Sequence, residues 1–105
     1  MRNNHSWEVV CVSYQDETDY DDCRALKEIG YLAPSLRTKK VDAVASMINS
    51  GLSNFHIMLD GRKIPLKSAE GTRYYARVKD EDTPDDPLLD LPTVTEYKNE
   101  KKFNR

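Results

Sequence analysis

The chain has 105 residues, of which 32% are charged and 38% are hydrophobic, and its formal net charge is −2 at pH 7. A chain of this length forms one domain with a single modest core. The longest apolar run, residues 9–12, is too short to span a membrane, and the first residues lack the apolar stretch of a secretion signal. Two cysteines, Cys11 and Cys23, are too few to form the disulfide framework of a small secreted protein, so we expect a cytoplasmic protein with free thiols.

Charge is distributed in blocks along the chain. Residues 15–22 hold five acids and no base, residues 35–79 hold nine Lys or Arg against three acids, and residues 80–90 hold six acids and no base. Such blocks usually form solvated faces and loops, and less often partner surfaces. They therefore predict solvent-facing surfaces of opposite charge.

The predicted domain spans residues 7–92 and begins with a strand. Residues 1–6 are expected to form a disordered tail. Residues 7–14 are rich in β-branched and aromatic side chains, and apolar side chains fall on both faces of the alternation. A strand that is apolar on both faces is typical of the centre of a sheet.

A short helix is predicted after the acidic loop of residues 15–22. Asp22 is a suitable N-cap for a helix over residues 23–28 that ends at Gly30. A helix of under two turns depends on packing for its stability. Residues 31–37 contain a proline and are expected to be irregular. The buried stripe of this helix would be Cys23, Leu26 and Ile29.

The main helix is predicted over residues 38–50. Its apolar side chains recur at the i, i+3, i+4 and i+7 spacing of one buried helix face. Thr38 is a suitable N-cap, and Gly51 is suited to the left-handed conformation that ends many helices. The predicted buried face consists of Val41, Val44, Ala45 and Ile48.

The Asp60-Gly61 pair predicts a tight β-hairpin, because apolar alternation flanks it and both turn positions of such a hairpin need positive φ. Pro65 predicts an edge strand, since proline has no amide hydrogen to donate. The two-residue turn predicts three pairs on the face that packs the helix: Leu59 with Arg62, Ile57 with Ile64, and Phe55 with Leu66. The opposite face would carry His56, Met58, Lys63, Pro65 and Lys67.

Residues 72–79 predict a further strand. Their alternation places Tyr74, Ala76 and Val78 on one side and four polar or aromatic residues on the other. The leucine-rich residues 88–92 are expected to pack against the core as a small leucine plug. Residues 93–105 are expected to form a charged tail. The elements together predict an α+β domain, in which an antiparallel sheet of about four strands carries one main helix on one face.

Six short motifs follow one another in a characteristic order: Cys11-Val12, Ile29-Gly30, Asp42-Ala43-Val44, Asp60-Gly61-Arg62, Tyr75-Ala76-Arg77 and Leu88-Leu89-Asp90-Leu91-Pro92. In this order the chain resembles, over roughly residues 7–92, the small bacterial, archaeal and phage proteins grouped as domain-of-unknown-function family 3892. The family usually has Asn-Asn where this chain has Asp86-Pro87, and tends to have Asp-Gly where this chain has Glu81-Asp82. The resemblance implies a fold and no activity.

Metal-binding and catalytic sites are not expected. The cysteines and histidines do not recur at the spacings of zinc ligands, and residues 80–86 lack the glycine and distal glutamate of a calcium loop. Cys11 and His56 form the one conceivable pair of nucleophile and base, but a thiol in the most apolar strand is by default buried and inert. We therefore expect no metal, no cofactor and no enzymatic activity.

The outward face of the hairpin and the last strand is the main candidate for ligand binding. Cationic side chains attract phosphates, and an exposed ring gives a base a surface to stack on. Alternatively, the cations only keep the sheet solvated, which the acidic pI of 5.7 favours, or the acidic residues 80–90 fold back and mask the face. The candidate residues are His56, Lys63, Lys67, Arg73, Tyr75, Arg77 and Lys79.

Three hypotheses for the function remain. The leading one is a small non-enzymatic binding or interaction module with a protein partner. The second is binding of nucleic acid or another phosphate ligand through the basic face. The third is a phage-type inhibitor that masks a host protein or sequesters a signalling nucleotide. Oligomerisation would favour the third, because small domains often form ligand pockets between subunits.

Overall fold

The computed structural model describes residues 5–103, so residues 1–4 of the expected disordered tail and residues 104–105 of the expected charged tail lie outside the described range. The strands are β1 (Ser6–Tyr14), β2 (Leu26–Leu32), β3 (Leu36–Lys40), β4 (Asn54–Leu59), β5 (Arg62–Pro65), β6 (Lys67–Glu70) and β7 (Tyr74–Arg77). The helices are η1 (Cys23–Ala25), α1 (Val41–Ser50), η2 (Pro87–Asp90) and α2 (Val94–Phe103), of which η1 and η2 are 3₁₀ turns.

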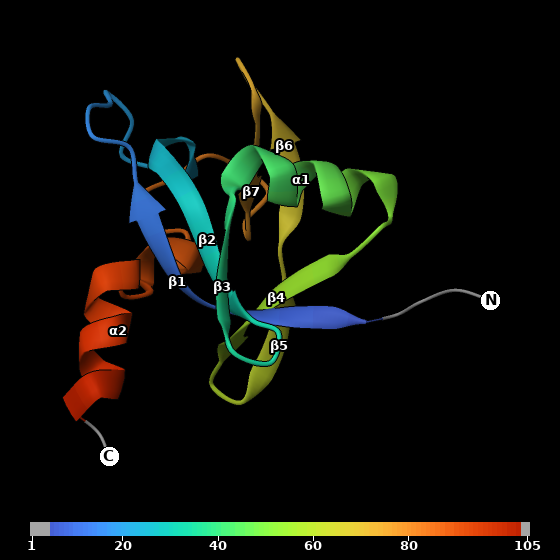
Figure 1. Cartoon of the computed structure of the whole chain (residues 1–105). Coiled ribbons are helices and arrows are strands. Elements are labelled where there is room, and N and C mark those ends of the chain that lie inside the picture. Colours follow the sequence, from blue (N-terminus) through green and yellow to red (C-terminus); the bar gives the residue numbers. More distant parts are fainter. Residues whose placement is uncertain (1–4, 104–105) are drawn as a thin grey trace.

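Five of the strands form one sheet in the order β3-β2-β1-β4-β5, with β1 at its centre as predicted (Figure 1). β1 pairs with β2 in the antiparallel and with β4 in the parallel direction. β6 and β7 form a separate two-stranded antiparallel sheet. A small sheet with a main helix agrees roughly with the predicted α+β class. The sheet is mixed rather than antiparallel, because the long connection through β2, β3 and α1 returns β4 parallel to β1.

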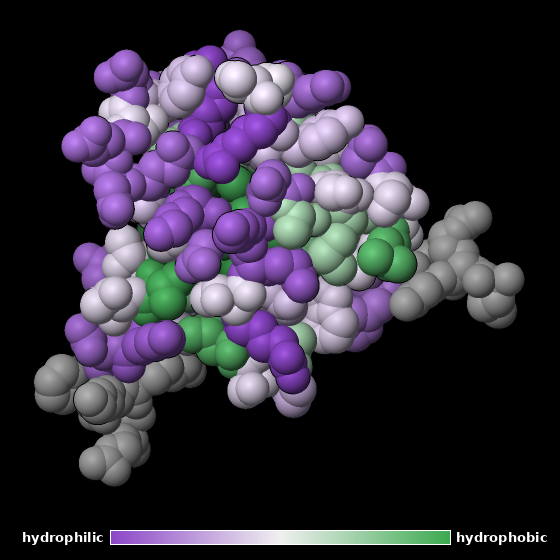
Figure 2. All heavy atoms as spheres, turned by 45° about the horizontal axis from the view of Figure 1, so that its top comes forward, coloured by the Kyte–Doolittle hydropathy of each residue, from purple (hydrophilic) through white to green (hydrophobic). Residues whose placement is uncertain are grey.

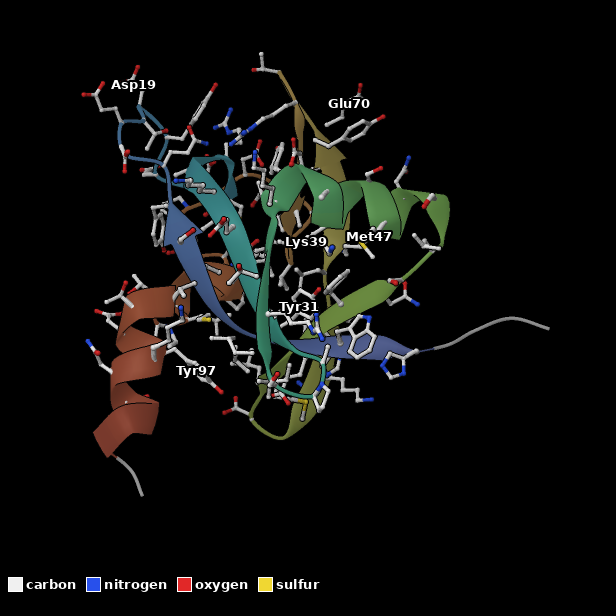
Figure 3. All side chains as sticks on the ribbon, viewed as in Figure 1. Asp19, Tyr31, Lys39, Met47, Glu70 and Tyr97 are labelled. Atoms are coloured by element: carbon white, nitrogen blue, oxygen red, sulfur yellow. The ribbon has the colours of Figure 1, made fainter. Side chains whose placement is uncertain are left out.

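The hydrophobic core lies between the five-stranded sheet and a second layer made of α1 and the β6–β7 pair (Figure 1). Tyr31, labelled in Figure 3, points from β2 into this layer; its ring centroid lies 5.3 Å from that of Phe55 and 6.1 Å from that of Trp7. Helix α2 lies beside β1, on the side of the sheet away from α1 (Figure 1). The middle of β1, residues 9–12, is therefore covered on both faces, which explains its apolar side chains on both sides.

The β4–β5 hairpin forms in the predicted register. Asp60 (φ 53°) and Gly61 (φ 78°) both have positive φ, and β5 is an edge strand of the sheet. Two expectations about its faces are wrong. Leu59 is 43% exposed instead of packing the helix, because it lies at the hairpin tip, and His56 is only 6% exposed instead of facing solvent. The confirmed pairs are Leu59 with Arg62 and Ile57 with Ile64, and the amide of Leu66 donates to the carbonyl of Phe55 (2.8 Å).

Helix α1 starts later than predicted. Thr38 is not its N-cap, because β3 pairs with β2 as far as Lys40 and holds Thr38 opposite Gly30. Lys40 takes the N-cap position and makes no side-chain capping bond. The end of the helix is as predicted, since Gly51 is left-handed (φ 78°) and its amide donates to the last turn.

Residues 23–37 differ most from the prediction. Asp22 caps η1 as expected, accepting a hydrogen bond from the amide of Arg24 (3.0 Å). The helix then stops after one turn, and residues 26–40 form the β2–β3 hairpin in place of the rest of the short helix, the irregular segment and the first residues of the main helix. The reason is tertiary, because β2 pairs with β1 on one side and with β3 on the other.

Helix α2 occupies most of the described part of the expected charged tail. Leu88 is fully buried, which confirms the leucine plug, and the carbonyl of Pro92 accepts from the amide of Val12 (3.0 Å). Thr93 and Glu96 then cap α2 reciprocally, with side-chain-to-amide distances of 2.9 and 3.1 Å. This Thr-x-x-Glu capping box is a sequence signal for the start of a helix.

Candidate functional site

The seven residues predicted as one basic face do not share a surface. His56 and Lys63 belong to the β4–β5 hairpin, whereas the other five belong to β6, β7 and the residues beside them. Tyr75 is only 5% exposed, so it does not present its ring to solvent, and Tyr74 (40% exposed) points outward in its place. The physical reason is that β6 and β7 leave the main sheet and fold over the core, which turns Tyr75 inward.

An acidic arm, residues 80–86, folds back onto several of these cations. Asp80 forms an ion pair with Lys67. The alternative in which the acidic residues mask the basic face is therefore confirmed for part of that face. The carboxylate of Asp82 lies close to three donors: the Tyr75 hydroxyl (2.6 Å), Arg77 Nη1 (2.6 Å) and Arg24 Nε (3.6 Å).

Asp82 is expected to contribute stability that depends on pH. Burial alone would raise the pKa of its carboxyl, but the hydrogen bonds from Tyr75 and Arg77 outweigh burial and hold this pKa below its ordinary value. Such a carboxyl stabilises the fold above its unfolded pKa of about 3.9, and loses that contribution as the pH falls through the lower folded pKa. The loss of unfolding free energy in Asp82→Asn should therefore be largest near neutral pH and shrink below about pH 4. Urea titrations near pH 7 and near pH 3 measure this loss of unfolding free energy. Equal losses at the two pH values would contradict a lowered pKa of Asp82 in the folded protein.

The arm is anchored at its far end by Asp86, which is 1% exposed. Its carboxylate accepts from the amides of Val78 (3.0 Å), Lys79 (2.9 Å) and Leu88 (2.9 Å). Sequence reasoning noted Asp86 only as a departure from family 3892 and gave it no structural role. The available signal was an aspartate directly before Pro-Leu-Leu, since aspartate followed by proline is typical of a helix start.

The strongest candidate for ligand binding is the Arg73 groove, which lies between the acidic loop, β2 and the β6–β7 turn. Two adjoining hollows of about 200 and about 280 Å³ share Gln15 and Arg73 as lining residues. In Figure 3, the labels of Asp19 and Glu70 mark the chain neighbours of Tyr20 and Gly71 on the two sides of the groove. Figure 2, with the top of Figure 1 turned forward, shows hydrophilic residues over this end of the molecule. The inner hollow is lined by Tyr20, Arg24, Gly71, Thr72 and Tyr75, and the outer one by Asp16, Lys27 and Lys40.

The cations of the groove fall into two kinds. Arg24 is held by Asp22 through two hydrogen bonds (2.6 and 2.9 Å), and its guanidinium lies 4.2 Å from the centre of the Tyr20 ring. The Arg73 guanidinium donates from Nη2 to the carbonyl of Leu26 (3.3 Å). Within residues 5–103, neither Arg73 nor the two lysines of the outer hollow has a carboxylate within ion-pair distance. Three cations of one hollow are therefore available to an anion.

Sequence reasoning found one of these three cations. Arg73 was part of the predicted basic face, but Lys27 and Lys40 were not. Lys27 was predicted in the short helix and Lys40 at the start of the main helix, whereas both belong to the β2–β3 hairpin. Lys79 lies elsewhere, beside a shallow hollow that also contains Lys67, Asp80 and Glu81.

Both cysteines are buried, as expected, which agrees with the inert thiol that the sequence favoured over a pairing of Cys11 with His56. Cys11 is 0% exposed, and burial raises the pKa of its thiol. Burial first, and then the charge of Asp86, raise the pKa of the Cys23 thiol far above its ordinary value. The ring of His56 instead contacts Ser6. Among the residues described, no three His, Cys, Asp or Glu side chains are grouped so as to hold a metal ion.

Comparisons of the chain with protein-family models, with curated proteins and with solved structures find no match. The resemblance to family 3892 therefore stays a prediction. None of the helices within residues 5–103 has the length and apolar character needed to cross a membrane.

Proposed function

We propose that the protein is a small binding module for a phosphate-bearing ligand, and that the phosphate binds in the outer hollow of the Arg73 groove. The observation that supports this is the contrast in charge pairing. The acidic arm and Asp22 neutralise Lys67, Arg77 and Arg24, whereas Arg73 keeps no carboxylate partner within residues 5–103. Three cations without an ion pair in the described part of the chain, Lys27, Lys40 and Arg73, line this hollow against one acid, Asp16, so the hollow carries an excess of positive charge.

The chemistry of the groove fits phosphate better than a lone carboxylate. A guanidinium presents a fork of N–H donors to phosphate oxygens, and two ammonium groups add charge without a fixed geometry. The Tyr20 ring, 43% exposed, stands at the other end of the groove, where a nucleobase could stack. The ligand class that combines both features is a nucleotide or a short single-stranded nucleic acid.

Charge reversal in the groove is expected to weaken phosphate binding. Arg73→Glu and Lys27→Glu should each reduce the affinity for a fluorescent nucleotide or oligonucleotide by about tenfold or more, because each removes a charge-assisted contact. Fluorescence polarisation at about 50 and about 200 mM salt measures the affinity and its salt dependence. The matched control is Lys79→Glu, which makes the same charge change at an exposed site outside the groove.

Two outcomes would contradict the proposal. One is the absence of salt-sensitive binding to DNA, RNA and cyclic-nucleotide probes. The other is an equal loss of affinity in Lys79→Glu, which would indicate attraction by overall charge rather than a site. The interaction-module and inhibitor hypotheses would then be the ones to test, by capture of a protein partner from host extract.

A further inference from the structure

A second groove, of about 560 Å³, lies at the N-terminal end of β1, on the sheet face away from α1. Strand register explains which side chains meet there. Glu8 of β1 is the parallel partner of His56 in β4, and Ser6 lies two residues before Glu8 and thus on the same face. Lys63 of β5 is the partner of Met58, so it falls on this face as well. We name this site the Ser6 groove.

Ser6 and His56 are in direct contact. The distance from Ser6 Oγ to His56 Nδ1 is 2.7 Å, a short hydrogen bond, and it joins residues 50 positions apart. His56 is 6% exposed, so its ring is held in place by its surroundings, whereas Ser6 remains half-buried at the wall of the groove. The Ser6 hydroxyl, hydrogen-bonded to the His56 imidazole, has the components of an activated serine nucleophile. The carboxylate of Glu8, the strand partner of His56, belongs to the same face of the sheet.

We propose that Ser6 is a nucleophile that reacts with small carboxylic esters, with His56 as its general base. Ser6 Oγ attacks the ester carbonyl carbon while its proton moves to His56 Nδ1, and the carbonyl π electrons move onto oxygen. The tetrahedral species then collapses, expelling the alcohol, which takes the proton from His56 and leaves an acyl group on Ser6. Water, deprotonated by His56, attacks the acyl carbon in turn, releases the acid and restores Ser6.

The remaining groups of the groove fit this chemistry. Trp7, Leu32 and Met58 give it a mostly apolar wall for the acyl chain. The Lys63 ammonium lines the same groove and can stabilise the negative charge that develops on the carbonyl oxygen. Burial first, and then the charge of Lys63, hold the pKa of His56 below its ordinary value, which favours the neutral ring at pH 7. In the tautomer with its proton on Nε2, Nδ1 accepts the hydrogen bond and then the proton of Ser6.

This proposal differs from the sequence-based expectation that the protein is not an enzyme, and the experiment below tests the two against each other. That expectation considered Cys11 with His56 as the only pair, because Ser6 was assigned to the disordered tail. Ser6 is instead the first residue of β1, and the parallel β1–β4 pairing brings it to His56. The Ser6 groove shares no lining residue with the Arg73 groove, so the two proposals stand or fall separately.

The experiment is ester turnover combined with identification of the modified residue. Wild-type protein is incubated with p-nitrophenyl butyrate, and in parallel with a fluorophosphonate probe, and peptide mass spectrometry locates any adduct. The expected result is p-nitrophenol release with an adduct on Ser6. Ser6→Ala should abolish both, and His56→Gln should slow the reaction by about 100-fold. Ser50→Ala, which removes an exposed hydroxyl at the end of α1, is the matched control and should retain full activity.

The pH dependence of the acylation rate shows whether His56 acts as a general base or only holds Ser6 in position. The titratable groups that line the groove with His56 are His5, Glu8 and Lys63. With His56 as base, the acylation rate should rise through a pKa below about 6.5 and reach a plateau near neutral pH. An adduct on any residue other than Ser6, undiminished turnover in folded Ser6→Ala, or the absence of both adduct and turnover in the wild type would each overturn the proposal. Since His56→Gln alters a buried residue, circular dichroism checks its fold, and the Ser6 variants decide the outcome if it does not fold.

Discussion

Replacing Asp86 with alanine is expected to lower the free energy of unfolding by about 3–5 kcal/mol. The buried carboxylate accepts three backbone amides that alanine would leave without partners, those of Val78, Lys79 and Leu88. An unsatisfied buried donor costs about 1–3 kcal/mol, and a domain of this size has about 5–15 kcal/mol in total. Denaturant titration followed by tryptophan fluorescence measures the change, since Trp7 is the single tryptophan of the chain.

Two further variants make this test specific to the anchor. Asp85→Ala removes an exposed carboxylate next to it and should change the stability by less than about 0.5 kcal/mol. Asp86→Asn keeps one acceptor oxygen of the two that bind amides, so an intermediate loss is expected. If the free energy of unfolding of Asp86→Ala lies within about 1 kcal/mol of that of the wild type, the three amides find other partners and Asp86 is not the anchor of the acidic arm.

The sequence correctly predicted the turn and the helix end, where the backbone conformation depends on one or two neighbouring residues. The turn at Asp60-Gly61 requires positive φ at both positions, and this requirement alone set the register of the hairpin. The end of α1 at Gly51 follows from the same freedom of glycine. The centrality of β1 followed from its two apolar faces.

The parts that were predicted wrongly depend on long-range pairing. Residues 26–32 have apolar side chains at positions that suit either a short helix or a strand, and only the neighbours β1 and β3 select the strand. The alternation of residues 74–78 correctly placed Ala76 and Val78 inside, but Tyr74 is exposed and Tyr75 is buried in its place, because the β6–β7 pair leaves the main sheet. Periodicity identifies faces, and tertiary structure decides which face is buried.

Long-range pairing also explains why neither candidate site could be predicted in full from the sequence. The Arg73 groove joins Lys27 and Lys40 to Arg73 across two different sheets, and the acidic arm removes Lys67 and Arg77 from the basic face by ion pairing. The contact of Ser6 with His56 needs the parallel pairing of β1 with β4. Charge counting along the chain detects the blocks, but it does not show which charges pair.

Replacing Gly30 with alanine is expected to lower the free energy of unfolding by about 2 kcal/mol, because the new methyl group has no space. Gly30 is the strand partner of Cys11. A Cβ at position 30 would lie 2.3 Å from Cys11 Sγ and 3.4 Å from Leu36 Cδ1. Cys11 is 0% exposed, so its sulfur cannot move toward solvent. The Gly30 requirement is therefore steric and does not come from backbone conformation. Urea denaturation measures the loss.

A double-mutant cycle tests whether Cys11 is the cause. Cys11→Ala removes the sulfur that the new methyl group meets and alone should destabilise the fold by leaving a small cavity. In the double variant the alanine at position 30 fills part of the space that the sulfur vacates. We therefore expect the double variant to be more stable than the sum of the two single effects by about 1–2 kcal/mol, as for residues in direct contact. Additive effects would show that the cost of Gly30→Ala arises elsewhere, with Leu36 as the nearest remaining side chain.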